Sequence, residues 1–211
     1  MRTNVYVDAF NFYYGCRKST PYKWLDLRAF CHASFPGDTI NRIRYFTALV
    51  KSDASDPNRT NRQLVYLRAL ATVPDLSIHE GQFLKSTKKG RLVAPLVTGV
   101  GLVTVEVWEE KGSDVNIAAH LLADGFRGDY DQAILISNDS DLVEPIRLVR
   151  SELQRPVGVL SPHRPSGKPS FHLRRVASFY RTVDRSLLGS SQFQPELTDS
   201  QGRVVRKPAG W

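Results

Sequence analysis

The chain has 211 residues, 41% of them hydrophobic, and its formal net charge at pH 7 is +8. This length suits one domain with appendages, and the hydrophobic fraction can fill a core, which excludes wholesale disorder. The charge favours a polyanionic partner such as nucleic acid, but a generally basic protein without such a partner explains it equally well.

Several features of the sequence bear on where the protein works. No apolar stretch approaches the ~18–20 residues of a membrane span, and a strand-like run at Val5 begins without a preceding signal peptide. Cys16 and Cys31 show neither CxxC nor metal-ligand spacing. We therefore expect a soluble cytoplasmic protein, not attached to a membrane, with reduced thiols; a disulfide is the less favoured alternative.

Predicted strands and helices alternate along the first part of the chain. Pro57 suits the opening of a helix, because its missing N–H has no partner there in any case. The expected strands are Val5–Val7, part of Ile40–Val50, and Leu76–Glu80, and the expected helices are Leu25–Phe35 and Pro57 to about Ala71.

The same alternation continues after an irregular stretch, Gln82–Gly101, in which we expect a basic loop from Lys85 to Arg91. Ala133–Ile136 has four apolar residues without polar alternation, which is typical of a parallel strand covered on both faces. The other expected strands are Val103–Trp108, Pro156–Leu160 and an edge strand at Phe179–Val183, and the expected helices are Val115–Phe126, Leu142 to about Leu153 and a turn at Phe171–Ala177.

The alternation predicts an α/β fold with a parallel, doubly wound sheet and flanking helices. We expect one domain over residues 1–188. From about Gly189 the chain is rich in Gln, Pro, Ser, Gly, Arg and Lys, so residues 189–211 are expected to form a basic, flexible tail.

Carboxylates stand at three junctions between predicted strands and helices. Asp8 follows the first strand, Asp114 opens a helix, and Asp139 and Asp141 follow the central strand. Asp is a favoured helix N-cap, which explains any one of them alone. Ligands of open α/β sheets bind at the carboxyl ends of strands, so we expect these acids to converge there. Their repulsion would favour a hard cation such as Mg²⁺ or Mn²⁺, which can activate water and stabilise phosphoryl charge.

Three blocks of this sequence together resemble the signature of the NYN domain, a LabA-like branch of the PIN-like nucleases. They are Val7–Gly15, Glu110–Val115 and Ile136–Leu142, and the resemblance spans about residues 3 to 183. It implies a Rossmann-like PIN fold and metal-dependent hydrolysis of RNA. By position it implies metal ligands at Asp8, Asp114 and Asp139, a further catalytic candidate at Asp141, and a supporting catalytic residue at Asn11.

Two positions depart from the pattern of this family. Asn138 stands where relatives often have Gly, a mild change because Asn tolerates the left-handed backbone conformation. His120 stands where relatives often have a further Asp, which removes a negative charge and would weaken a second metal site. The alternative for His120 is that its ring simply packs on its helix.

The candidate contacts to RNA are aromatic, basic and small polar side chains. Aromatic rings at a groove edge stack on unpaired bases, and basic side chains hold phosphates without reading the sequence. Each of these residues also has an ordinary explanation in the core, in a turn or on the solvated surface. The candidates are Tyr13, Lys88, Lys89, Arg91, Lys111, Asn138 and Ser140.

These observations predict a metal-dependent endoribonuclease that acts on RNA, chiefly single-stranded RNA, with Mg²⁺ or Mn²⁺ as cofactor. Two alternatives stay open: a module that binds RNA without cleaving it, and an enzyme that binds a small anionic or heterocyclic molecule in the same crevice. A dinucleotide fingerprint fails, because Gly99-Val-Gly101 lacks the third glycine. The oligomeric state stays open, with a homodimer among the options.

Overall fold

The computed structural model of the protein describes residues 1–91, 102–163 and 169–211. Within these residues, six strands form one parallel sheet in the order β3-β2-β1-β6-β7-β8. The order runs one way from β1 through β2 to β3 and the other way from β6 through β7 to β8, so the prediction of a parallel, doubly wound sheet is confirmed. The strands are β1 (Arg2–Asp8), β2 (Thr39–Thr47), β3 (Leu76–Glu80), β6 (Gln132–Ile136), β7 (Val157–Ser161) and β8 (Phe179–Thr182).

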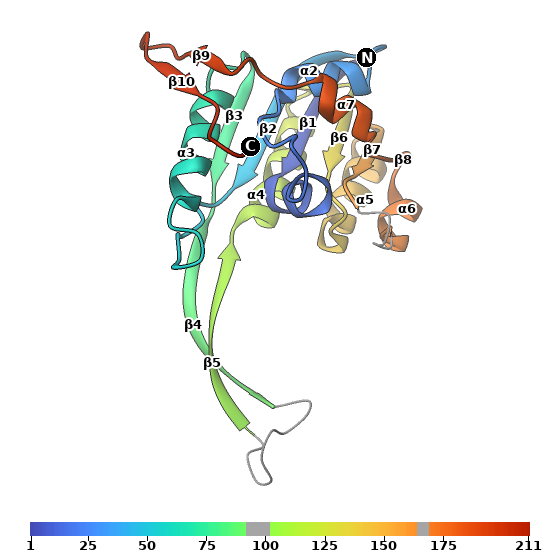
Figure 1. Ribbon diagram of the computed structural model, residues 1–211. Helices are drawn as coiled ribbons and strands as arrows, with labels where there is room; N and C mark the ends of the chain where they lie inside the picture. The colour runs from blue at the N-terminus through green and yellow to red at the C-terminus, as the bar shows by residue number, and fades with distance from the viewer. Residues whose placement is uncertain (92–101, 164–168) are drawn as a thin grey trace.

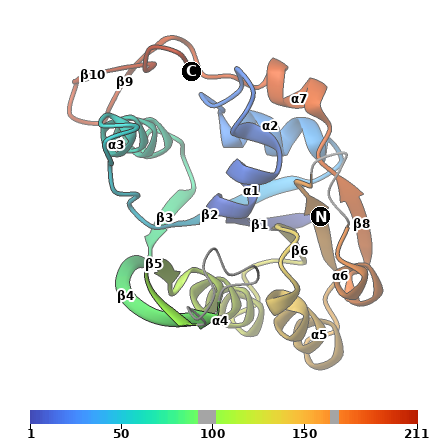
Figure 2. The ribbon, with the colours of Figure 1, turned by 60° about the horizontal axis from the view of Figure 1, so that its bottom comes forward.

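Helices cover both faces of this sheet (Figure 2). On one face lie α1 (Ala9–Phe12), α2 (Leu27–Ser34), α3 (Arg59–Leu70) and α7 (Arg185–Ser190). On the other lie α4 (Ser113–Phe126), α5 (Val143–Glu152) and α6 (Phe171–Val176). A π-helical turn η1 (Tyr13–Arg17) extends α1, and a 3₁₀ turn η2 (Ser140–Leu142) precedes α5. None of the helices in the described ranges has the length and apolar character needed to cross a membrane.

The central strands are buried because each contributes side chains to both layers. In β1, Val5 and Val7 join the cluster under α1 and α2, whereas Tyr6 joins the cluster under α4 and α5. This is the period of two expected of a strand. In β6 every residue is buried, as the unbroken apolar run of Ala133–Ile136 predicted.

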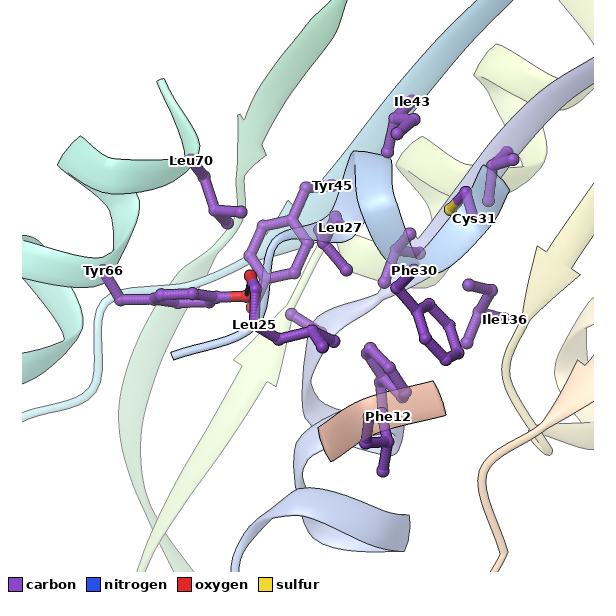
Figure 3. Packing of buried hydrophobic residues seen from close by; sticks show 14 of the residues in the cluster. Phe12, Leu25, Leu27, Phe30, Cys31, Ile43, Tyr45, Tyr66, Leu70 and Ile136 are labelled. Atoms are coloured by element: carbon purple, nitrogen blue, oxygen red, sulfur yellow. Dashed lines mark hydrogen bonds between the residues drawn. The ribbon is translucent and has the colours of Figure 1, made fainter. Parts of the chain in front are cut away.

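The layer around α2 shows how the sequence pattern becomes packing (Figure 3). Leu27, Phe30 and Cys31 form the buried face of α2, and the Phe30 ring lies 5.6 Å from that of Phe12. Asp26 caps the helix by accepting hydrogen bonds from the first backbone N–H groups. Cys31 and Cys16 are both buried free thiols, and burial raises the pKa of each to about 12, so both stay protonated.

The expected loop in Gln82–Gly101 is wrong for the residues that the structure describes. β4 (Gln82–Arg91) pairs antiparallel with β5 (Leu102–Lys111) along their whole length. The hairpin extends away from the body of the domain (Figure 1). In β4 most side chains on both faces are polar or charged, so the period-two apolar signal of a strand is missing from that half of the hairpin. Residues 92–101, part of the same expectation, lie outside the described residues.

The expectation of a flexible tail from residue 189 is also contradicted. Residues 196–198 and 204–206 form the strands β9 (Glu196–Thr198) and β10 (Val204–Arg206), which pair antiparallel. Val205 is 1% exposed within the main hydrophobic core, and the Trp24 indole N–H donates to the carbonyl of Gln194 at 2.8 Å. The polar composition hid widely spaced apolar anchors, which suffice because the rest of the domain supplies their partners.

Candidate functional site

The carboxylate of Asp8 lies at the carboxyl end of the central strand β1, where the strand order reverses. It caps α1, since Oδ1 accepts a hydrogen bond from the N–H of Asn11 at 3.0 Å. Oδ2 accepts from the hydroxyl of Ser137 at 2.9 Å, across the switch point between β1 and β6. Asp8 is only 6% exposed, and these two donors hold its carboxylate in one orientation.

The turn after β6 is tied to Asp8 through Ser137. The Ser137 hydroxyl also accepts from the N–H of Asp139 at 3.0 Å, so one buried oxygen links two carboxylate-bearing residues. Asp139 in turn caps η2, because its Oδ1 accepts from the N–H of Asp141 at 3.0 Å. The turn that follows the buried strand thus presents Asp139 half-buried and Asp141 exposed.

Asn11 and Asn138 join the same two loops from the other side. The Asn11 side-chain oxygen accepts from the backbone N–H of Asn138 at 3.0 Å. The Asn138 side-chain oxygen accepts from the hydroxyls of Ser161 and Tyr180 and from the N–H of Ser170. These contacts make Asn138 a link between the turn after β6 and the segments around β7 and β8.

The third acidic position comes from α4. Asp114 is the second residue of that helix, and Glu110, at the end of β5, holds the helix start. Glu110 Oε1 accepts from the hydroxyl of Ser113 at 2.9 Å and from its N–H at 3.2 Å. Gly112 makes the turn between them with a φ of 103°, a conformation that glycine adopts without strain.

The carboxylates are close enough to perturb one another. Burial raises the pKa of Asp8 to about 6, and the charges of Asp114 and Asp139 add to the effect against the two hydrogen bonds that lower it. Burial likewise raises the pKa of Asp114 to about 6, helped by the charges of Asp139, Glu110 and Asp141. Asp8, Asp114, Asp139 and Asp141 therefore share one electrostatic neighbourhood at one edge of the sheet.

The residues fit a hard divalent cation by their chemistry. They offer carboxylate oxygens, and a cation among them would relieve the repulsion that raises their pKa values. Across the described ranges, however, no group of three or more His, Cys, Asp or Glu side chains lies close enough together to hold a metal ion. The carboxylates are thus neighbours, and their side chains do not form a finished coordination shell.

The predicted RNA contacts fall into separate places. Lys111 ends β5 three residues before Asp114, with its Nζ 3.3 Å from a carboxylate oxygen of Glu109, and Ser140 is exposed in η2. Lys88, Lys89 and Arg91 lie on β4 instead, and Lys88 forms an ion pair with Glu109. Arg91 pairs with Leu102 at the far end of the ladder, roughly 30 Å from the Gln82–Lys111 pair at the 3.4 Å rise of a strand. The structure therefore does not bring these three basic residues to the acidic edge.

A cavity of about 550 Å³ borders the site on the opposite face of the sheet from α4. Tyr13 lines it together with Ala9 and Phe10, which directly follow Asp8, but Asp8, Asp114 and Asp139 themselves do not. The predicted aromatic contact thus belongs to this cavity rather than to the acidic group.

The His120 ring packs against residues of β2 and β3. Its ring lies 4.2 Å from that of His79 and 5.7 Å from that of Phe46, measured between centroids. Burial and the nearby Arg44 guanidinium lower its pKa. His120 therefore belongs to a neutral aromatic cluster with His79 and Phe46.

Two residues of the site were absent from the predicted set: Ser137, which orients Asp8, and Glu110, which positions Asp114. Glu110 stands in the same sequence block as Asp114, three residues before Ser113, and that spacing was the signal available. Only the fold shows that Ser137 donates to Asp8, which lies 129 positions away in the sequence.

The model of the NYN domain family matches residues 2–184. The chain is 31% identical over 186 residues to a protein of Pseudomonas putida named 6-hydroxy-3-succinoylpyridine 3-monooxygenase HspA. That match covers 77% of this chain and 60% of the relative's length.

A solved structure shares the fold. It is a protein of unknown function from Vibrio parahaemolyticus, with a TM-score of 0.52 and 17% sequence identity. The alignment covers 87% of this chain and 93% of that one. The likeness supports the α/β architecture, which is consistent with a Rossmann-like PIN fold.

Proposed function

Because the chain belongs to the NYN domain family, which is nuclease-like, we propose that it is a metal-dependent endoribonuclease acting on single-stranded RNA. The observation that carries the proposal is the group of mutually perturbed carboxylates at the switch point of the sheet. Asp8 and Asp114 each have a pKa of about 6 beside Asp139. Such clusters of shifted carboxyl groups in a strand-end crevice are characteristic of functional sites.

In this proposal Asp8, Asp114 and Asp139 would hold Mg²⁺ or Mn²⁺, and Asp141 would add negative charge from η2. The chemistry that the cation supplies when bound is polarisation of a water molecule and of a phosphodiester group. The chain's own contribution is orientation. Ser137 and the N–H of Asn11 fix the carboxylate of Asp8, and Glu110 fixes the start of the helix that carries Asp114.

RNA would enter across the exposed turn at Ser140. Lys111 ends β5 three residues before Asp114, and we propose that its amine, which pairs with Glu109, meets a phosphate and so holds a strand without reading its bases. Tyr13, in the adjoining cavity, offers a ring on which an unpaired base can stack. We do not assign Asn138 a substrate contact, because its side-chain oxygen serves Ser161, Ser170 and Tyr180.

The test is cleavage of a labelled single-stranded RNA in Mn²⁺, comparing the native protein with Asp139→Asn. We expect the variant to lose activity by at least about 100-fold, because changing even the outer partners of metal ligands costs about 10–100-fold. Asp75→Asn is the matched control: Asp75 is exposed, outside the site, and its φ of 60° suits Asn.

Full cleavage by Asp139→Asn would reject the mechanism. Binding of RNA that weakens with salt, but with no cleavage by the native protein in either metal, would instead identify the non-catalytic binding module. Both outcomes are read from the same samples by running the binding and cleavage assays in parallel.

An enzyme acting on a small molecule is the second candidate, favoured by the name of the Pseudomonas putida relative. Since the match covers 60% of that protein's length, its activity reaches this chain only as a proposal. The check is consumption of 6-hydroxy-3-succinoylpyridine by this chain, with dioxygen and a reductant supplied, followed by chromatography. Turnover of this compound without RNA cleavage would replace the ribonuclease proposal.

A further inference from the structure

The ribonuclease proposal uses only the Tyr13 ring of the cavity of about 550 Å³ beside α1 and leaves the rest of this cavity unexplained. It lies near the carboxyl ends of β1 and β2, with Ala9 and Thr47 on one side and residues of η1 and α3 on the others. Its volume falls within the ~300–1,000 Å³ of cavities that hold small molecules. No carboxylate of the acidic group contributes to its wall, so it requires its own explanation.

Arg17 gives this cavity a buried positive charge. Its side chain lines the cavity, although the residue is only 1% exposed. The guanidinium donates to the backbone carbonyls of Tyr22 and Lys23, and its carbon lies 4.8 Å from the ring centroid of Tyr66. These partners are neutral. Among the described residues no carboxylate forms an ion pair with Arg17, and a buried charge without an opposite charge is costly.

The remaining wall adds to the positive charge. Of the described residues that line the cavity, five are basic (Arg17, Lys18, Lys23, Arg59 and Arg62) and two are acidic (Asp53 and Asp56). The carboxylate of Asp56 is engaged by Arg62, and the guanidinium of Arg59 donates to the hydroxyl of Tyr14 at 2.8 Å. The cavity therefore has more positive charge than its own carboxylates can balance.

Aromatic rings form much of the rest of the wall. Tyr13, Tyr66 and Trp211 line the cavity, and the Trp211 ring meets that of Tyr66 edge to face at 5.8 Å between centroids. Figure 3 shows Tyr45, which also lines the cavity, beside Tyr66 at the edge of the hydrophobic core. Such rings favour a flat, π-bonded ligand over a flexible aliphatic one.

We propose that this cavity binds a planar aromatic molecule that carries an anionic group, with the anion at Arg17 and the ring among Tyr13, Tyr66 and Trp211. Two sources supply this chemistry: a nucleotide, whose anion is a phosphate, and an aromatic carboxylate. This proposal shares only the Tyr13 ring with the ribonuclease proposal. None of the acidic residues lines the cavity and binding at Arg17 needs no metal, so either proposal can fail without the other.

The experiment is calorimetric titration of the full chain in EDTA. The probes are adenosine monophosphate and nicotinate, each with its uncharged counterpart, adenosine or nicotinamide. We expect at least one anion to bind saturably at or below about 1 mM, at least tenfold more tightly than its uncharged counterpart. We expect Arg17→Met to weaken that binding by at least about tenfold, as loss of a charge-assisted hydrogen bond does.

Two further variants keep the test decisive. Arg59→Gln removes a half-buried charge from the cavity wall and should weaken binding of the same anion. This variant therefore tests whether the cavity binds the anion if Arg17→Met does not fold. Arg147→Gln removes an exposed charge on α5, on the opposite face of the sheet, and should leave binding unchanged. Tighter binding of adenosine monophosphate would identify the ligand as a nucleotide, and tighter binding of nicotinate would identify it as an aromatic carboxylate. The proposal is overturned if neither anion binds, if the uncharged counterparts bind equally well, or if the variants at Arg17 and Arg59 keep full affinity.

Discussion

A single hydroxyl group organises the acidic edge of this domain. Ser137 donates to the Asp8 carboxylate and accepts from the N–H of Asp139, although it is fully buried and carries no charge. The Ser137 hydroxyl therefore orients two carboxylate-bearing residues at once. Its removal leaves a buried acceptor and a buried donor without their partner, which ordinarily costs about 1–3 kcal/mol.

We therefore predict that Ser137→Ala weakens the proposed metal site before it abolishes folding. The hydrogen bond from Ser137 lowers the pKa of Asp8, so its loss leaves Asp8 less ready to ionise and less firmly oriented. The Mn²⁺ concentration for half-maximal RNA cleavage should rise about 10–100-fold. Ser151→Ala, exposed on α5, is the control, and an unchanged Mn²⁺ requirement in Ser137→Ala would contradict the positioning role.

Asp124 is a second buried carboxylate, and its setting is the opposite of that of Asp8. Arg44 donates to both its oxygens, at 2.7 and 2.8 Å, and the hydroxyl of Tyr6 donates at 2.8 Å. Burial alone would raise the pKa of Asp124, but these hydrogen bonds and the charge of Arg44 outweigh it and lower the pKa. Asp124 is thus a structural anion that joins α4 to β1 and β2.

The lowered pKa of Asp124 predicts that the free energy of unfolding decreases at low pH. Because Asp124 binds its proton less readily when folded, its contribution is complete above the unfolded pKa of about 4 and is lost as pH falls through the lower folded pKa. Asp124→Asn should cost about 3–5 kcal/mol at pH 7, since Arg44 is left buried without its partner. Urea unfolding from pH 7 to pH 2 should show a shallower decline below pH ~4 in the variant, and parallel curves would refute this assignment.

The β4–β5 hairpin extends far from the acidic edge, and any contact that it makes with RNA depends on this length. It carries Lys88, Lys89 and Arg91 away from the acidic edge (Figure 1). Lys88 is paired with Glu109, while Lys89 and Arg91 are exposed towards the far end. A strand of RNA that reached both the hairpin and the acidic edge would have to span several nucleotides.

If the hairpin holds RNA phosphates, the salt dependence of binding should report it. Removing two contacts in Lys89→Gln/Arg91→Gln should reduce the slope of log K against log salt by about 1.4, at about 0.7 per contact for single strands. Lys88→Gln is the matched control, since that charge already has a protein partner. Fluorescence anisotropy at several salt concentrations gives the slopes, and equal slopes would show that the hairpin makes no phosphate contact.

For the whole molecule, the C-terminal segment completes the layer around α2 and α3. Phe193 packs on Trp24, Trp211 packs on Tyr66, and Asp199 forms an ion pair with Arg68 of α3. β9 and β10 lie beside α3 (Figure 1). Residues 189–211 therefore contribute to the folded body, and one wall of the cavity depends on their last three residues.

Adjacent valines in β10 test this directly. Val205 is 1% exposed and Val204 is 50% exposed on the same strand. Val205→Ala should lower the free energy of unfolding by about 1.6 kcal/mol, at about 0.8 kcal/mol for each buried carbon removed, while Val204→Ala should stay within about 0.5 kcal/mol of the native protein. Chemical denaturation measures both, and equal stabilities would mean that the segment does not pack in solution.

Where the pattern was strong, the sequence predicted the elements well. The apolar run Ala133–Ile136 became the buried β6, and Leu76–Glu80 became β3 with the same bounds. The prediction was wrong where the pattern was weak. β4 is a strand whose partner, not its own composition, holds it extended, and the C-terminal anchors are too far apart in the sequence to form a period.

The amino-acid sequence by itself determined the parallel α/β sheet and the positions of its acids, because strand periodicity and strand-end carboxylates are local features of the chain. Only the tertiary structure decided which groups meet. It joined Ser137 to Asp8, seated His120 against His79, and enclosed Arg17 without a carboxylate. Such pairings depend on how strands far apart in the sequence are ordered in the sheet, and no local pattern encodes that order.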